Sequence, residues 1–175
     1  MVEKIEFKEL QIADISKDIL DNYSRYKEMK RRYNYENGKW VIIDDDWIDD
    51  WNKEKKDKVI IDFSDTINEG GYVFGAYEDK KMIGFAVLYN KKFGSNNQYI
   101  QLDNMQVSNG YRNKGIGKKL FEMCVKKAKE TEIEKIYISA NPSEDTVKFY
   151  ISVGCKDAME INKELAEKEP YDRQM

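Results

Sequence analysis

Apolar residues recur with a period of about two in several short runs of the chain, which is typical of strands that bury one face. The stretch Glu78-Asp79-Lys80 separates two of these runs and predicts a hairpin. A polar loop is expected around Asn37-Gly38, which is a turn signal. The predicted strands cover residues 2–10, Tyr72–Tyr77, Lys81–Leu88, Tyr99–Val107, Lys135–Ala140 and Cys155–Met159.

Elsewhere the apolar residues recur at steps of three and four, which predicts helices with one apolar face. The first such segment has apolar residues from Ile12 through Ile19 to Met29 at this spacing. Gly154 suits the end of the last helix. The predicted helices cover residues 12–33, Trp47–Asn68, Gly115–Glu130 and Thr146–Val153.

This order of elements predicts an α/β protein with a mixed central sheet. The strand, helix and strand over residues 99–140 imply a parallel pair with a right-handed crossover, and the hairpin before them implies antiparallel neighbours. The chain has 175 residues, only two prolines and no linker-like stretch, so we predict one domain over residues 1–175.

Composition excludes several kinds of chemistry. The chain has no histidine, so catalysis by Ser-His-Asp or Cys-His is excluded, and no metal site is expected. Acid–base chemistry must use Asp, Glu, Tyr, Lys, Cys or water. Cys124 and Cys155 are too few for a disulfide framework, and the spacing of Cys124 predicts a core position. With no secretory signal and no apolar run of about 18 residues, we predict a cytoplasmic protein that does not contact a membrane.

Charge is unevenly distributed. The net charge of −3 argues against nucleic-acid binding. The segment from Tyr111 to Lys129 nevertheless holds seven Lys or Arg and one Glu, whereas Asp44 to Asp50 holds five Asp and no cation. A basic segment on an acidic protein suggests a site for one anionic ligand.

The basic segment begins as a loop between a predicted strand and a predicted helix. Its sequence is Ser108-Asn109-Gly110-Tyr111-Arg112-Asn113-Lys114-Gly115-Ile116-Gly117-Lys118. Unpaired N–H groups in the first turn of a helix bind phosphate well, and glycine lets the backbone approach it. Neither common nucleotide motif fits: Ile116 stands where a Walker A loop needs Lys, and Leu120 stands where a dinucleotide fingerprint needs glycine.

What remains is Arg112-x-x-Gly115-x-Gly117, and here the sequence resembles the GNAT acetyltransferase superfamily. The resemblance covers residues 72–159 and includes Phe149-Tyr150 with Gly154 behind it. It implies a splayed sheet with helices on both faces, an acetyl-CoA core over residues 70–160 and an acceptor side over residues 1–69. The cofactor contacts it implies are Met105, Gln106, Val107, Arg112, Asn113, Lys114, Gly115, Ile116, Gly117, Lys118, Asn141, Ser143 and Tyr150.

The resemblance also implies roles in catalysis. Tyr150 matches the position that protonates the leaving thiolate. Family members often carry a Glu on the strand of residues 99–107, and Asp103, which alternation places on one face with Gln101 and Met105, is the candidate base. An ordered water is the alternative to a single base.

The expected function is therefore transfer of an acetyl group from acetyl-CoA to a primary amine, without a covalent enzyme intermediate. The acceptor is a small molecule or a peptide amine. The acidic segment, expected to join the first two helices, favours a cationic amine. Two alternatives stay open: a non-catalytic acyl-CoA sensor and an unrelated phosphate-binding protein. A homodimer is also open.

Overall fold

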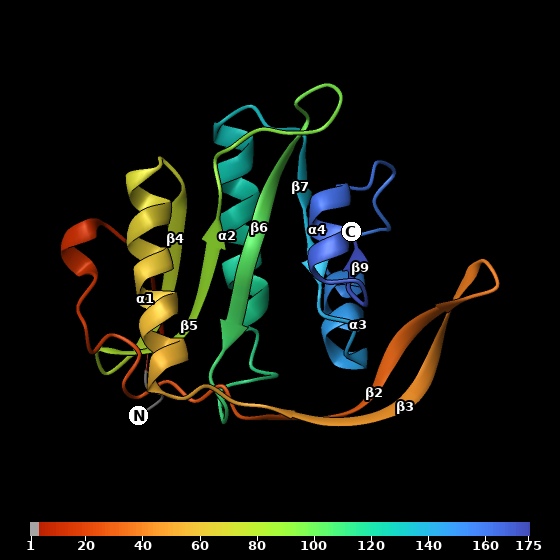
Figure 1. The fold of residues 1–175 in the computed structure, drawn as a ribbon. Coiled ribbons are helices and arrows are strands. Elements are labelled where there is room, and N and C mark those ends of the chain that lie inside the picture. The colour runs from red at the N-terminus through yellow and green to blue at the C-terminus, as the bar shows by residue number, and fades with distance from the viewer. Residues whose placement is uncertain (1–3) are drawn as a thin grey trace. The chain divides into compact units, whose positions relative to one another are not determined.

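A computed structural model describes residues 4–175, so the start of the predicted strand over residues 2–10 lies outside the described part. The chain forms two compact units (Figure 1). The first comprises residues 1–26 and 50–136, and the second comprises residues 27–49 and 137–175. A single domain over residues 1–175 stays a prediction.

A five-stranded sheet organises the first unit. Its order is β1-β4-β5-β6-β7. The pairs β1–β4, β4–β5 and β5–β6 are antiparallel, and β7 runs in the same direction as β6 in Figure 1. Asp79 and Lys80 both have positive φ, 47° and 64°, as a two-residue hairpin turn requires. The strands are β1 (Glu6–Glu9), β4 (Tyr72–Glu78), β5 (Lys81–Leu88), β6 (Tyr99–Val107) and β7 (Lys135–Tyr137).

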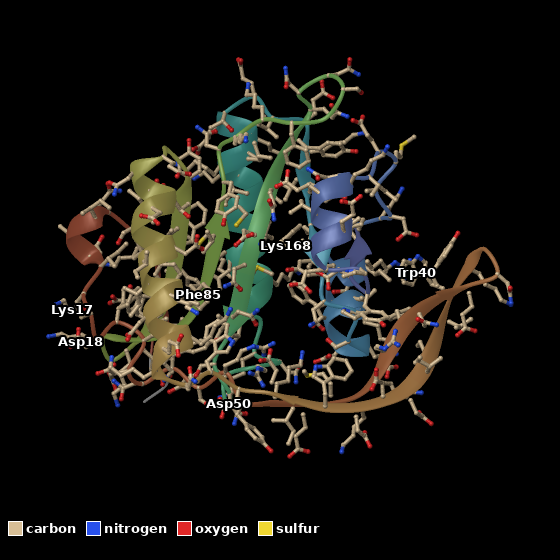
Figure 2. All side chains as sticks on the ribbon, in the orientation of Figure 1. Lys17, Asp18, Trp40, Asp50, Phe85 and Lys168 are labelled. Carbon is tan, nitrogen blue, oxygen red and sulfur yellow. The ribbon has the colours of Figure 1, made fainter. Side chains whose placement is uncertain are left out.

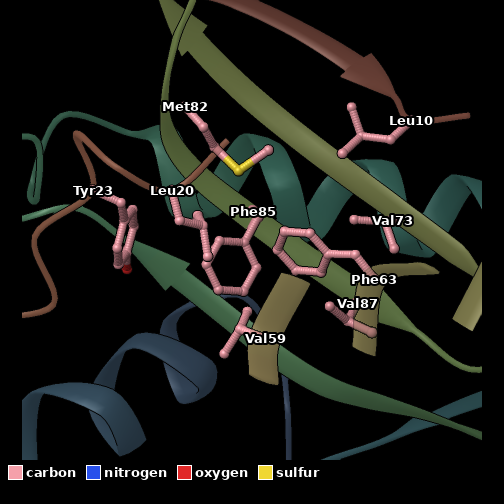
Figure 3. Packing of buried hydrophobic residues seen from close by; sticks show 9 residues of the cluster. All are labelled: Leu10, Leu20, Tyr23, Val59, Phe63, Val73, Met82, Phe85 and Val87. Atoms are coloured by element: carbon pink, nitrogen blue, oxygen red, sulfur yellow. The ribbon is translucent and has the colours of Figure 1, made fainter. Parts of the chain in front are cut away.

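Two helices cover opposite faces of this sheet. Phe85 of β5 packs its ring on Phe63 of α1 (Lys53–Asn68), with centroids 4.9 Å apart (Figures 2 and 3). A Cβ on the preceding residue, Gly84, would lie 3.2 Å from Ile116 of α2 (Ile116–Glu130). Successive strand residues point to opposite faces. The predicted mixed sheet with helices on both faces is therefore confirmed.

The core of the first unit lies between α1 and the sheet. Burying each large apolar side chain there contributes roughly 1.5–3 kcal/mol. Cys124 of α2 is fully buried, as its spacing predicted. The cluster comprises Leu10, Leu20, Tyr23, Val59, Phe63, Val73, Met82, Phe85 and Val87 (Figure 3).

The predicted helix over residues 12–33 is wrong. A single 3₁₀ turn, η1 (Ile12–Asp14), is followed by turns and then by β2 (Lys27–Glu36). Leu20 and Tyr23 are buried from this irregular segment, so burial rather than helical periodicity explains their spacing. Asn37 and Gly38, with φ of 50° and 81°, form the tight turn between β2 and β3 (Lys39–Asp49). The Asn-Gly signal marked a hairpin.

The second predicted helix starts later than expected. Trp47 belongs to β3, and α1 begins at Lys53. The Asn52 side chain accepts a 2.9 Å hydrogen bond from the Lys55 N–H, which caps the helix.

The second unit holds the β2–β3 hairpin and the C-terminal elements. Its helices are α3 (Glu144–Ser152) and α4 (Lys163–Lys168), and a short pair joins β8 (Ser139–Ala140) to β9 (Arg173–Gln174). Gly154, with φ of 96°, follows the end of α3 as predicted.

The strand predicted over residues 155–159 does not form. Residues 173–175 instead pair with the chain beside β8, where Ile138 and Met175 exchange two 2.8 Å main-chain hydrogen bonds. The Ala158 N–H donates to the Gln174 carbonyl from outside any strand. The tail thus occupies the place that a strand over residues 155–159 would need.

Candidate functional site

The loop between β6 and α2 presents the start of α2 to solvent. Gly115 is the N-cap of α2 and has φ 81° and ψ 0°, a left-handed conformation that strongly favours glycine. The cap makes no side-chain hydrogen bond, and the first turn holds no acidic residue. The leading N–H groups of a helix have no partners within it. With exposed Lys114 and Lys118 alongside, this loop suits a phosphate-like anion.

Arg112 makes a different set of contacts from the expected one. Its Nε donates to the carbonyl of Val107 at 3.0 Å, its Nη1 to that of Tyr26 at 2.8 Å and its Nη2 to that of Arg25 at 2.8 Å. Most of its donors therefore face main-chain oxygens. These three hydrogen bonds fix the shape of the loop, and this structural role of Arg112 is separate from any contact that it makes with a bound anion.

Residues 24–26 form hydrogen bonds with the loop between β6 and α2, and both segments belong to the first unit. The Ser24 N–H donates to the Ser108 Oγ at 2.9 Å, and the Asn109 N–H donates to the Ser24 carbonyl at 2.8 Å. Tyr111 closes the turn with a 3.0 Å hydrogen bond from its N–H to the Ser108 carbonyl. Sequence reasoning missed this contact because main-chain carbonyls leave no signal in the residue types.

The end of β6 has main-chain groups on an edge that β5 does not use. The Ser108 N–H donates to the Ile83 carbonyl of β5 at 2.8 Å. Main-chain groups alternate in direction along a strand, so those of Met105 and Val107 point away from β5 and those of Gln106 point toward it. β7 has three residues against nine in β6, too few to pair along it all. Met105 and Val107 thus fit an extended ligand better than Gln106.

Asp103 lies at an irregularity in β6. Val87 pairs with Asn104 and Leu88 pairs with Leu102, so Asp103 has no counterpart on β5. Such a β-bulge interrupts the alternation of side chains. The expectation that Asp103 shares a face with Met105 is therefore unsupported. Gln101 donates from Nε2 to the Asp103 Oδ1 at 3.0 Å.

Tyr89 joins Asp103 to α1. Its hydroxyl donates to Oδ1 of Asp62 at 3.3 Å and also has the Asp103 carboxylate as a hydrogen-bond partner. Burial raises the pKa of Tyr89, and the two carboxylates raise it further. Burial likewise raises the pKa of Asp62, with repulsion from Asp103 as the next cause. Nothing in the residue pattern marked Asp62 or Tyr89.

In the second unit, Asn141 and Ser143 shape the start of α3. The Ser143 N–H donates to Oδ1 of Asn141 at 3.0 Å, and the Ser143 hydroxyl donates to the Thr146 hydroxyl at 2.7 Å. Ser143 is 1% exposed, whereas Asn141 is exposed. Of the two, Asn141 is the better placed to contact a ligand.

Tyr150 lies farther along α3 and is 6% exposed. Its ring packs edge-on against Phe149, with centroids 5.3 Å apart. The predicted site residues are therefore divided: Asp103, Met105–Val107 and Arg112–Lys118 lie in the first unit, and Asn141, Ser143 and Tyr150 lie in the second.

The acidic segment is part of a strand, so the expectation that it joins two helices is wrong. β3 pairs with β2, which carries Lys30, Arg31 and Arg32. Arg32 Nε lies 2.6 Å from an Asp45 oxygen, and Lys30 Nζ lies 3.7 Å from one of Asp46. Cations of the same hairpin thus offset the charge of two of the five Asp residues in this segment.

Two kinds of feature are absent from residues 4–175. Among residues 4–175, no group of three His, Cys, Asp or Glu side chains lies close enough together to hold a metal ion. Within the same part of the chain, no helix has the length and apolar character needed to cross a membrane.

Comparison with known proteins gives a consistent picture. A model of the acetyltransferase (GNAT) family matches residues 39–154. An uncharacterized N-acetyltransferase from Schizosaccharomyces pombe is 33% identical over 92 residues, which are 53% of this chain. The match spans 63% of that relative's length.

Solved structures share the fold. A putative streptothricin acetyltransferase from Bacillus anthracis, in complex with acetyl coenzyme A, is 21% identical with a TM-score of 0.65, over 86% of this chain and 83% of that one. A GNAT family acetyltransferase from Elizabethkingia anophelis with acetyl-CoA bound is 26% identical with a TM-score of 0.50, over 64% of this chain and 69% of that one.

Proposed function

The chain belongs to the acetyltransferase (GNAT) family, and on that premise we propose that it transfers the acetyl group of acetyl-CoA to a primary amine. The observation that carries the proposal is the uncapped start of α2 beside the end of β6, which the three-residue β7 is too short to cover. The pyrophosphate of acetyl-CoA suits the start of α2, and its amide-containing pantetheine arm suits the main-chain groups at the end of β6. Both features lie in the first unit and are tied together by the Arg112–Val107 hydrogen bond.

The proposed binding mode assigns one part of acetyl-CoA to each feature. The N–H groups at the start of α2, with Lys114 and Lys118, hold the pyrophosphate. The outward main-chain groups of Met105 pair with the pantetheine arm as an added strand would, while the Val107 carbonyl keeps its hydrogen bond from Arg112. The Val107 N–H then stabilises negative charge on the thioester oxygen during attack.

The reaction needs a neutral amine, while a free alkylamine is mostly protonated because its pKa is about 10.4. Asp103, directly or through water, takes that proton. The amine nitrogen then attacks the carbonyl carbon, the C–S bond breaks, and an amide and the CoA thiolate form. Tyr150 gives the thiolate its proton, a role for which a phenol is suited.

We propose a cationic amine as the acceptor class. The basis is Asp103, which is exposed on β6, with the second carboxylate of Asp62 nearby. Negative charge at this point raises the local concentration of cations. This assignment replaces the acidic segment of β3, where Asp45 and Asp46 already have cations of the same hairpin beside them.

The experiment has two arms. Calorimetry should show binding of acetyl-CoA and much weaker binding of ATP and NAD, and Gly117→Val should weaken acetyl-CoA binding because the side chain stands where the pyrophosphate approaches. Equal binding of ATP would contradict the cofactor assignment.

The second arm measures release of CoA with a panel of polyamines, lysine, peptide N-termini, aminoglycosides and streptothricin. Release with a cationic amine supports the proposal. Binding of acetyl-CoA without release under any acceptor would instead identify an acyl-CoA sensor.

A further inference from the structure

Strand pairing alone does not orient the side chain of Asp103. It is the extra residue of the bulge between Leu102 and Asn104 and is exposed. A bulge redirects the side chain at the extra position and removes the neighbour that a paired strand would supply. The contacts of the carboxylate therefore decide where it points.

Tyr89 supplies one of those contacts from a fixed position. It follows the end of β5, and its N–H donates to the Gln101 carbonyl of β6 at 2.9 Å. Its hydroxyl reaches both Asp103 and, at 3.3 Å, Asp62 of α1. The phenol thus bridges a helix and the bulge while its own backbone is fastened to β6.

The charges around the phenol explain how it behaves. The raised pKa of Tyr89 keeps the hydroxyl protonated, so it acts as a donor. The groups facing Asp62 are Tyr89, whose hydrogen bond lowers the pKa of Asp62, and Asp103, Asp65 and Glu69, which raise it along with burial. Repulsion between Asp62 and Asp103 is mutual, so the one phenol proton is shared between two carboxylates that compete for it.

We propose that Tyr89 is a positioning residue for Asp103, with Asp62 as the second anchor of the Tyr89 hydroxyl. This rests on the proposed function, in which Asp103 accepts the proton of the acceptor amine. When the ammonium approaches, the hydroxyl keeps its hydrogen bond to Asp62 alone and leaves an Asp103 oxygen free. The N–H bond breaks, its electron pair stays on nitrogen, and the proton bonds to that oxygen before passing to solvent.

One test needs no turnover: titration of the Asp103 carboxyl carbon followed by ¹³C NMR in the free protein. Tyr89→Phe should move the titration midpoint up, because a donor to the charged form is lost. Asp62→Asn should move it down, because a like charge is lost. Tyr77→Phe and Asp57→Asn are matched controls from β4 and α1 and should leave it in place. Unchanged midpoints in both test variants, or shifts in the same direction, would overturn the proposal.

A double-mutant cycle tests the same point in catalysis. Asp103→Asn should lower kcat/KM by about 10²-fold or more, as loss of a general base does, with acetyl-CoA affinity unchanged. Tyr89→Phe should cause a smaller loss that disappears in the Asp103→Asn background. Equal losses in both backgrounds would show that Tyr89 acts independently. Full activity of Asp103→Asn would contradict the base assignment itself, while the titration still decides whether Tyr89 positions Asp103.

Discussion

The guanidinium of Arg112 donates a 2.8 Å hydrogen bond to the carbonyl oxygen of Arg25, a residue 87 positions earlier in the chain. Two further bonds from the same group reach Tyr26 and Val107. A planar guanidinium holds its donors on three nitrogens in a fixed fork, so it can meet three separated carbonyls at once, whereas an ammonium has all its donors on one nitrogen. Arg112 therefore fastens the anion-binding loop to the segment that leads into β2.

This contact predicts a stability defect in Arg112→Lys. An ammonium keeps the charge but cannot reach all three carbonyls, so at least one buried or half-buried oxygen loses its donor. We expect the free energy of unfolding to fall by about 1–3 kcal/mol, the range for leaving a buried hydrogen-bond acceptor unsatisfied. Urea unfolding measures it.

Lys114→Gln is the matched control for Arg112→Lys. It removes a neighbouring exposed cation, so it should weaken acetyl-CoA binding and its salt dependence while leaving the unfolding free energy nearly unchanged. If Arg112→Lys proved as stable as the parent and lost only acetyl-CoA affinity, Arg112 would be a ligand of the anion rather than a fastener of the loop.

The parts of the fold that local chemistry determines could be predicted from the sequence. β5 and β6 have their predicted bounds, and α2 starts one residue after its predicted start. In each of these elements the spacing of the apolar residues and the position of the turn residues predict the same bounds. The Gly115 cap needs a left-handed backbone, and the glycine at this position shows it.

Long-range contacts determine what could not be predicted. Ile12, Ile15 and Ile19 have helical spacing, but burial of Leu20 and Tyr23 in the core favours an irregular path. The candidate site divides in the same way. The loop was visible in its glycines and cations, whereas the partners of Arg112 are backbone carbonyls and the bridge through Tyr89 depends on pairing between distant segments.

Tyr150→Phe tests the proposed acid. The substitution keeps the ring and its edge-on packing against Phe149, so the fold should be preserved. If the hydroxyl protonates the thiolate, the rate of the chemical step should fall by about 10²–10⁴-fold with little change in acetyl-CoA affinity. Single-turnover experiments measure that rate separately from product release. Unchanged single-turnover chemistry would remove Tyr150 from the mechanism.

Asp172 predicts a pH dependence of stability in the second unit. It accepts a 2.9 Å hydrogen bond from Ser139, and burial, with repulsion from Glu169, raises its pKa from 3.8 to about 6. The folded state thus binds this proton more tightly than the unfolded state does. The resulting stabilisation is fully present below about pH 4 and is lost as the pH rises through about 6.

Asp172→Asn should remove this part of the pH dependence. Unfolding by urea at intervals between pH 4 and 7 should show the parent losing stability relative to the variant as the pH rises. Asp57→Asn, which neutralises a half-buried carboxylate paired with Lys53 on α1, is the control and should keep the parental slope. A parental slope in Asp172→Asn would show that Asp172 has no such role.

The hairpin of β2 and β3 gives the last prediction, on where the acceptor binds. Asp45 is paired with Arg32 at 2.6 Å, and Asp46 lies 3.7 Å from Lys30. A carboxylate already matched by a cation attracts a second cation weakly. Changing Asp44, Asp45 and Asp46 together to Asn should therefore leave kcat/KM for the best cationic amine within about threefold of the parent, consistent with exposed ion pairs worth about 0–1 kcal/mol.

The comparison variant is Asp62→Asn, which removes a carboxylate beside Asp103 in the other unit. It should lower kcat/KM for cationic amines more than the triple change does, and added salt should narrow the difference because it screens the attraction that remains in the parent. Acetyl-CoA affinity should be the same in both. If instead the triple variant lost tenfold or more at low salt and Asp62→Asn lost nothing, the acceptor would bind along β3. The net charge of the hairpin, rather than its individual pairs, would then determine specificity.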